Sequence, residues 1–229
     1  VFQTPEFVRP VDCPVMYMEP CIDITAEKNK LLSPKEVKKY LKEIKGDHRN
    51  RPVDPDQRFF LCVSRYDPWK GQKQVIKAFE SLMEKYPDVD LYFVGSFATD
   101  DPEGVKYYKE IMKLAEENPR IHLFKNLSNF QVNAMQTKAE AVLQVSTREG
   151  FGLTATEASW KGTPVIVSNR GGLKVQIKDG IDGYVVDPEN VEEIAKAMEG
   201  VLNNPLRARE MARHARKKVE EKFALTSVE

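Results

Sequence analysis

The feature that most constrains the fold is a regular alternation of short apolar runs with amphipathic segments, which begins at Phe59. Residues 59–64 are almost all apolar, as in a strand buried on both faces, and residues 71–86 place apolar side chains at helical spacing. Strands joined by helices form a mostly parallel sheet covered on both faces, so the pattern predicts an α/β domain. The same reasoning predicts strands at 90–95, 121–124, 141–145, 164–167 and 182–186, and helices at 103–118, from 128, 154–161, 191–202 and 207–223.

The first part of the chain does not follow this alternation. Early prolines break any helix there, and residues 15–18 are predicted to form a short strand. A helix should begin after Ser33, because Pro34 suits the first helical position and Glu36 is placed to close a capping box. The polar stretch 46–57 contains two prolines and is predicted to be a loop.

The charges and cysteines exclude several classes of protein. The chain has 35 Lys and Arg and 35 Asp and Glu, so it has no overall attraction for nucleic acid or an anionic membrane. Cys13, Cys21 and Cys62 are far apart, which argues against a disulfide framework or zinc site and favours the reducing cytoplasm. No apolar run reaches the roughly 18 residues of a membrane span, and no signal peptide is recognisable.

The loop at 64–71 follows a predicted buried strand and opens a helix. In such sheets ligands bind at the carboxyl ends of the strands. Arg65 and Lys70 place two cations beside a helix N-terminus, whose N–H groups are unpaired, and this combination suits a diphosphate. The alternative is an ordinary charged surface loop.

The loop at 148–157 also follows a predicted strand. Gly150 and Gly152 would let a ligand approach the backbone closely, and the amides that follow open a helix. Glu149 is suited to accept hydrogen bonds from sugar hydroxyls, and Glu157 from a ribose diol. The alternative is that the first is a loop carboxylate and the second a helix-surface charge.

Taken together, the two loops resemble the C-terminal domain of retaining glycosyltransferases of the GT-B fold, the glycogen synthase and sucrose synthase relatives of glycosyl-transferring family 4. The paired-glutamate motif of that family, E-x7-E, is matched by Glu149 and Glu157, and its basic pair by Arg65 and Lys70. The resemblance covers residue 20 onward. Three segments are closest to the glycosyl-transferring trehalose synthases, although neighbours with other acceptors share them: 67–71 (DPWKG), 100–104 (DDPEG) and 149–154 (EGFGLT).

This resemblance implies a domain organisation. Residues 25–229 would form a Rossmann-like, nucleotide-sugar-binding domain, with core strands from about residue 58. Residues 1–24 would be the tail of a missing N-terminal domain and the crossover from it. Val1 in place of Met favours the same interpretation.

The resemblance also implies roles for single residues. Arg65 and Lys70 would neutralise the departing diphosphate, Glu149 would position the donor sugar, and these three form the expected catalytic set. Glu157 would hold the ribose. The pair at 171–172 is either a flexible loop near the donor or an ordinary turn. The other donor-binding residues implied are Gly95, Asn126, Leu127, Gly150, Phe151, Gly152, Leu153 and Thr154.

No cofactor or metal is expected, because two cations and a helix N-terminus can stabilise the leaving nucleoside diphosphate. The Asp-x-Asp spacings at 54–56 and 88–90 precede strands and so belong to the opposite edge of the sheet. The expected partners are a nucleotide sugar, in the first place UDP- or ADP-glucose, and a sugar acceptor reached through the missing domain. A homodimer stays open.

The leading hypothesis is a retaining transferase that moves a hexosyl group, glucosyl in particular, to a sugar acceptor, with glucose as the acceptor that gives trehalose. In that case this chain alone should be inactive. An alternative is a nucleotide-sugar-binding module without turnover. A phosphorylase is less favoured because no pyridoxal lysine site is recognisable, and an epimerase because it gives no reason for paired glutamates.

Overall fold

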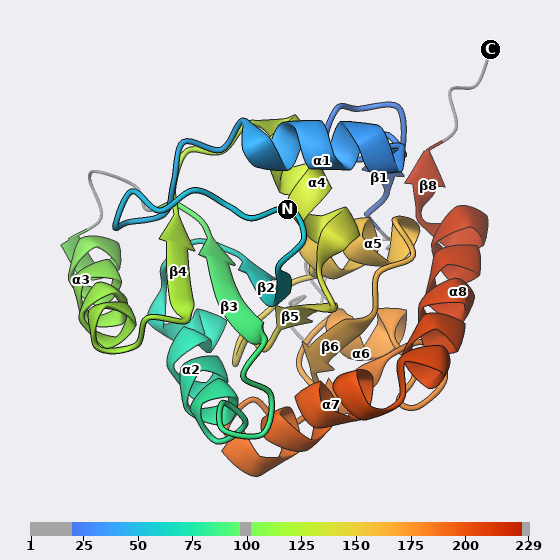
Figure 1. Cartoon of the computed structure of the whole chain (residues 1–229). Helices are drawn as coiled ribbons and strands as arrows, with labels where there is room; N and C mark the ends of the chain where they lie inside the picture. Colours follow the sequence, from blue (N-terminus) through green and yellow to red (C-terminus); the bar gives the residue numbers. More distant parts are fainter. Residues whose placement is uncertain (1–19, 97–101, 226–229) are drawn as a thin grey trace.

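In the computed structural model, residues 20–96 and 102–225, which the structure describes, form a six-stranded parallel sheet between two layers of helices (Figure 1). The strand order is β4-β3-β2-β5-β6-β7. The strands are β2 (Arg58–Val63), β3 (Val89–Val94), β4 (Ile121–Phe124), β5 (Ala141–Gln144), β6 (Val165–Ser168) and β7 (Tyr184–Val186). The helices are α1 (Pro34–Lys42), α2 (Gln72–Glu80), α3 (Pro102–Glu117), α4 (Asn129–Lys138), α5 (Leu153–Trp160), α6 (Leu173–Gln176), α7 (Val191–Asn203) and α8 (Pro205–Lys222), with a 3-10 turn η2 (Pro68–Lys70).

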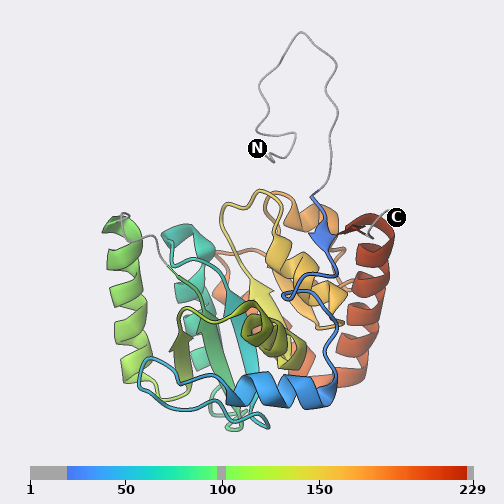
Figure 2. The same cartoon turned by 90° about the horizontal axis from the view of Figure 1, so that it is seen from above.

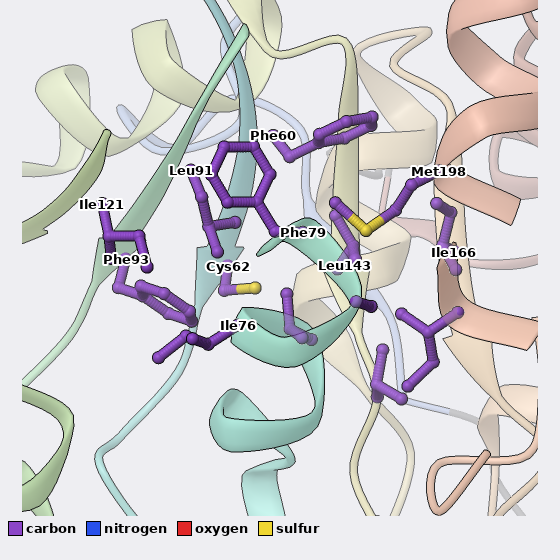
Figure 3. Close-up of a cluster of buried hydrophobic side chains, with 14 of the residues drawn as sticks. Phe60, Cys62, Ile76, Phe79, Leu91, Phe93, Ile121, Leu143, Ile166 and Met198 are labelled. Carbon is purple, nitrogen blue, oxygen red and sulfur yellow. The ribbon is translucent and has the colours of Figure 1, made fainter. Parts of the chain in front are cut away.

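The central strand β2 supplies both halves of the core. Phe60 and Cys62 join a cluster with residues of α2, α3 and α7, which Figure 3 shows in part. Phe59 and Leu61 join a second cluster with residues of α1, α4 and α5. Successive strand residues point to opposite faces of a sheet, so one apolar run serves both layers. This confirms the predicted α/β fold with helices on both faces.

Several helix starts follow their sequence signals. Ser33 and Glu36 form the expected capping box at α1, and Ser128 and Gln131 form another at α4. Asn190 accepts a hydrogen bond from a first-turn amide of α7. Such caps satisfy N–H groups that the helix itself leaves unpaired. The residue at which each of these helices begins is therefore determined by its local sequence.

Some expected boundaries were wrong. Helix α2 ends at Glu80 and not at 86, because Ser81 donates a side-chain hydrogen bond to the carbonyl of Ala78 at 2.7 Å and tight turns follow. Strand β7 starts at Tyr184 and not at 182, since the carboxylate of Asp182 accepts hydrogen bonds from the preceding turn and from α8. The short helix α6 was not predicted. The strand expected at 15–18 lies outside the described residues.

The two ends of the described chain lie together. The two-residue strands β1 (Ile22–Asp23) and β8 (Ala224–Leu225) pair in parallel as a separate small sheet. Helix α8, which leads into β8, packs against α5 and α7. Figures 1 and 2 show α8 and α3 at opposite sides of the domain.

The segment between β1 and α1 is fastened to the main domain. The side chain of Asn133 in α4 donates to the carbonyls of Glu27 and Lys30, each at 2.8 Å. The indole N–H of Trp160 in α5 donates to the carbonyl of Asn29 at 2.8 Å, and this tryptophan is buried. We call residues 26–30 the strap.

The strand order reverses between β2 and β5. The chain builds β2, β3 and β4 in one direction and then returns to place β5 on the other side of β2. Loops that leave β2 and β5 at their carboxyl ends therefore diverge, and a crevice opens between them. Within the described residues, no helix is both long and apolar enough to cross a bilayer.

Candidate donor-binding site

Two of the cavities formed by the described residues open at the carboxyl edge where the strand order reverses. The β2–β4 cavity, about 340 Å³, is lined by Lys28, Val63, Ser64, Arg65, Val94, Gly95, Ser96, Asn126, Leu127, Asn129, Val132 and Thr154. The β2–β5 cavity, about 370 Å³, is lined by Pro20, Val63, Ser64, Arg65, Lys70, Gln144, Glu149, Phe151, Gly152, Leu153 and Thr154. Four lining residues are common to both, so the two cavities adjoin and share a wall.

The loops after β2 and β5 are held against each other by backbone contacts. The amide of Thr147 donates to the carbonyl of Trp69 at 2.8 Å, so Trp69 braces the loop through its backbone. Gly71 has a φ of 74°, and a Cβ there would lie 2.1 Å from the carbonyl oxygen of Val145. Only glycine fits both the conformation and the close approach.

Lys70 and Glu149 form the centre of the β2–β5 cavity. Lys70 Nζ lies 2.9 Å from Glu149 Oε2, with side-chain exposures of 15% and 12%. The same oxygen accepts hydrogen bonds from Gln144 Nε2 at 2.8 Å and Ser146 Oγ at 3.1 Å, and the amide of Gly150 donates to Oε1 at 3.2 Å. Four donors thus fix the orientation of this carboxylate.

Gln144 connects this carboxylate to helix α5. Its Oε1 accepts from the amide of Ala155 at 3.0 Å, which leaves its Nε2 to donate to Glu149. The backbone donor therefore determines which way the amide points. Sequence reasoning missed Gln144, although a polar residue at the end of a buried strand was a usable signal.

The N-terminus of α5 faces this site. Its N-cap is Gly152, with a φ of 95° and no side chain of its own. Gln144 accepts from the amide of Ala155, whereas the amides of Leu153 and Thr154 have no side-chain acceptor among the described residues. Leu153 and Thr154, the first residues of the helix, line the β2–β5 cavity. Uncapped first-turn amides and the helix dipole favour an anion at this position.

Arg65 adds a cation to the wall that the two cavities share. Its side chain is 61% exposed, and its Nε lies 3.3 Å from the buried carboxylate of Asp67. Asp67 thus holds the base of the guanidinium while the rest faces the cavities. The β2–β5 cavity is therefore lined by two cations as well as by the first residues of α5: Arg65 on the shared wall and Lys70 beside Glu149.

The β2–β4 cavity contains the other expected residues. Gly95 lies so close to β2 that a Cβ would meet the carbonyl oxygen of Ser64 at 2.0 Å. Asn126 has a φ of 55°, which shapes the tight turn after β4, and Leu127 follows it.

Gly150 and Glu157 do not line either cavity, although both were predicted. Gly150 lies in the loop that carries Glu149, where its carbonyl accepts from the amide of Gly172 at 2.9 Å. Glu157 has 8% side-chain exposure; its Oε1 pairs with Lys28 Nζ at 2.9 Å, and its Oε2 accepts from Gln136 Nε2 at 3.2 Å. The group that faces the β2–β4 cavity is Lys28. Lys28 precedes the strand–helix alternation, and no sequence signal pointed to it.

The pair Gly171–Gly172 supports the glutamate loop. A Cβ at Gly171 would lie 1.7 Å from the carbonyl oxygen of Glu149. The side chain of Gln176 in α6 donates to the carbonyl of Phe151. The short helix α6 therefore packs behind the loop that carries Glu149, and residues 171–172 form the turn that leads into it.

Among residues 20–96 and 102–225, no group of three or more His, Cys, Asp or Glu side chains is arranged to hold a metal ion. Each Asp-x-Asp spacing has a carboxylate that is engaged in an ion pair. Asp56 pairs with Lys38, and Asp88 with Arg58. Independence from metal ions stays a prediction.

Comparison with known proteins places this geometry in context. Residues 43–218 match the family described as glycosyl transferases group 1. The trehalose synthase of Pyrococcus horikoshii is 38% identical over 99% of this chain and 54% of its own length. A trehalose phosphorylase of Pleurotus pulmonarius is 29% identical over 82% of this chain and 28% of its own. HepE of Anabaena, solved in complex with UDP-glucose, superimposes with a TM-score of 0.75 at 20% identity, over 89% of this chain and 52% of that one.

Proposed function

The chain belongs to the glycosyl transferases of group 1, and on this premise we propose that the whole protein is a retaining transferase. It would move a hexosyl group, glucosyl in the first place, from a nucleotide sugar to a sugar acceptor, with glucose as the acceptor that gives trehalose. The chain spans about half the length of the trehalose synthase it matches. The observation that carries the proposal is the pair of adjoining cavities with Arg65, Lys70 and the first residues of α5, Leu153 and Thr154, on their walls.

The two cavities suit the two ends of such a donor. The nucleoside would occupy the β2–β4 cavity, where the backbone near Gly95 and Asn126 offers polar groups to a base. The diphosphate would cross the shared wall at Arg65, and the sugar would enter the β2–β5 cavity beside Lys70 and Glu149. This arrangement puts the positive charge at the phosphate oxygens, where negative charge develops as the anomeric bond breaks.

The reaction would proceed on one face of the sugar. The bond between the anomeric carbon and the phosphate oxygen breaks, and its electron pair leaves with the diphosphate. The acceptor hydroxyl oxygen bonds to the anomeric carbon from the same side, and its proton passes to the departing phosphate. Glu149, held by four donors, would position the sugar hydroxyls.

Phosphorolysis is a second candidate, because a trehalose phosphorylase is also among the relatives. Inorganic phosphate would then occupy the position of the diphosphate at the α5 N-terminus. The β2–β4 cavity distinguishes the two reactions, since a phosphorylase that uses inorganic phosphate has no nucleoside to place there. We therefore favour the nucleotide sugar.

Calorimetric titration of the chain tests this choice. We expect UDP-glucose or ADP-glucose to bind more tightly than the matching diphosphate, and inorganic phosphate to bind weakly. Tight phosphate binding with no nucleotide binding would favour the phosphorylase. Binding of nucleotide sugars by this chain, with turnover only when the rest of the protein is present, would separate the enzyme from a module that only binds.

The two glutamates should contribute differently. Glu149→Gln should remove most of the extra affinity that glucose adds to UDP, about tenfold for a lost hydrogen bond to a charged group, and leave UDP binding nearly unchanged. Glu157→Ala should weaken UDP itself. Glu84→Gln is the control, because it removes the same negative charge at an exposed position. Equal losses of UDP affinity in Glu149→Gln and Glu157→Ala would contradict this division.

A further inference from the structure

The strap brings a cation to the β2–β4 cavity from outside the strand–helix domain. Lys28 lies outside residues 43–218, which match the family. Its neighbours in the strap are bound to α4 and α5 through Asn133 and Trp160. The backbone on both sides of Lys28 is therefore held in place, and its side chain extends to a cavity lined otherwise by the loops of the sheet.

Lys28 and Glu157 form a matched donor and acceptor at this cavity. The ammonium lies 2.9 Å from Glu157 Oε1 and is 32% exposed, whereas the carboxylate is 8% exposed. The other carboxylate oxygen accepts from Gln136, so the glutamate is anchored from behind. A ligand that enters the cavity thus meets the ammonium first, with the carboxylate beside it.

The chemistry of this pair selects the kind of group that fits. An ammonium only donates hydrogen bonds and a carboxylate only accepts them. A phosphate would be repelled by Glu157, and a carbonyl oxygen of a base has no hydrogen to give it. A sugar hydroxyl satisfies both groups, because its oxygen accepts from Lys28 while its hydrogen is donated to Glu157.

We infer that Lys28 is a nucleotide-binding residue of this site, whose ammonium contacts a ribose hydroxyl and is held in position by Glu157. This inference rests on the proposed function, since it presupposes a nucleotide in the β2–β4 cavity. It makes the strap, which precedes the alternation of strands and helices, part of the donor site. Glu157 then acts on the nucleotide together with Lys28 and not alone.

Titration with UDP and ADP tests the role of Lys28. Lys28→Met should weaken binding of the preferred diphosphate about tenfold, as expected for loss of a charge-assisted hydrogen bond, and Lys28→Arg should restore part of it. Lys30→Met, with the same charge change at an exposed position of the strap, should bind as the wild type does. Thermal unfolding of each variant, by circular dichroism, verifies that it is folded.

A comparison with 2′-deoxy-UDP and 2′-deoxy-ADP tests the contact itself. Removal of the 2′-hydroxyl should weaken binding of the diphosphate to the wild type. The same removal should lower the affinity of Lys28→Met less than twofold. If removal of the 2′-hydroxyl weakened binding equally in Lys28→Met and the wild type, or if Lys28→Met bound UDP more tightly, the role of Lys28 would be overturned. The proposed function would not be affected by that result. If the wild-type chain bound neither UDP nor ADP, the proposed function itself would fail.

Discussion

Gln144 is the residue whose position explains most about the β2–β5 cavity. It ends strand β5, accepts from the first turn of α5 and donates to Glu149. A residue that bonds both to a helix N-terminus and to the central carboxylate couples the position of each to the other. We expect Gln144 to act as a positioning residue, because in the proposed function Glu149 makes the contact with the sugar hydroxyls.

Gln144→Glu should reveal this role, because it should make the binding of UDP-glucose depend on pH. The new carboxylate still accepts from Ala155 but presents negative charge to Glu149, so the extra affinity of UDP-glucose over UDP should fall about tenfold at pH 8. Protonation of the added carboxyl at low pH should restore part of it. Calorimetry between pH 5 and 8 measures this, with Gln131→Glu in the α4 capping box as the control. A pH-independent loss would contradict the interpretation.

Much of the site was predictable residue by residue. Arg65, Lys70 and Glu149 were expected to converge because each follows the carboxyl end of a parallel strand, and they line one cavity. Lys28 was not predictable, since nothing in the sequence tells which distant side chain will cover Glu157. The engagement of Glu157 with the strap depends on tertiary packing that short motifs do not encode.

At the scale of elements, the loop before β2 protects the edge of the sheet. The amide of His48 donates to the carbonyl of Leu123 in β4 at 2.9 Å, and the amide of Leu123 donates to His48 Nδ1 at 3.2 Å. The polar stretch 46–57 was predicted only as a loop, yet part of it occupies the open edge of β4. A covered edge does not pair with other chains.

Two titrating groups secure this loop. Burial opposes ionisation of Asp47, but hydrogen bonds from Arg51 and Arg49 outweigh it and lower its pKa to about 2. Burial, with the charges of Arg49 and Arg51, lowers the pKa of His48 from 6.5 to about 4. Because the His48 side chain is only 4% exposed, its proton uptake is coupled to unfolding.

The free energy of unfolding should therefore fall as the pH decreases from 6.5 towards 4, since the unfolded chain protonates His48 and the folded chain does not. Urea unfolding measures how much the free energy of unfolding falls between pH 7 and pH 4.5. This fall should be about 2 kcal/mol larger in the wild type than in His48→Asn, a variant that keeps an acceptor for the amide of Leu123. The contribution of Asp47 should disappear only below its unfolded pKa of 3.8. His214→Asn, at an exposed position, should retain the full pH dependence.

For the whole molecule, the position of the site follows from the order of the strands. The alternation of strands and helices was sufficient to predict a parallel sheet with helices on both faces, and periodicity located most elements. It did not predict α6, β1 or β8, because segments of two to four residues carry too little periodicity. The reversal between β2 and β5 places both cavities at one edge.

A ligand that fills these cavities should stabilise the entire domain. At 100 times its Kd, UDP-glucose should raise the melting temperature by roughly 5–10 °C, since such an excess adds about 2.7 kcal/mol and a domain of this size shifts 2–4 °C per kcal/mol. Differential scanning fluorimetry measures this shift. The increase should be smaller for Glu157→Ala, and no increase for the wild type at saturating UDP-glucose would contradict binding.

The small parallel sheet of β1 and β8 has a mechanical consequence. Its two strands point the same way, with Ile22 beside Ala224, so tension applied between residues 20 and 225 loads their hydrogen bonds in shear. Only two residue pairs resist that load, and the six-stranded sheet is not stretched until they part. In a single-molecule pulling experiment, this two-stranded sheet should open first. The load should then fall on the hydrogen bonds that Asn133 and Trp160 make to the strap, so that the β2–β4 cavity loses the wall formed by Lys28 while the six-stranded sheet is still folded.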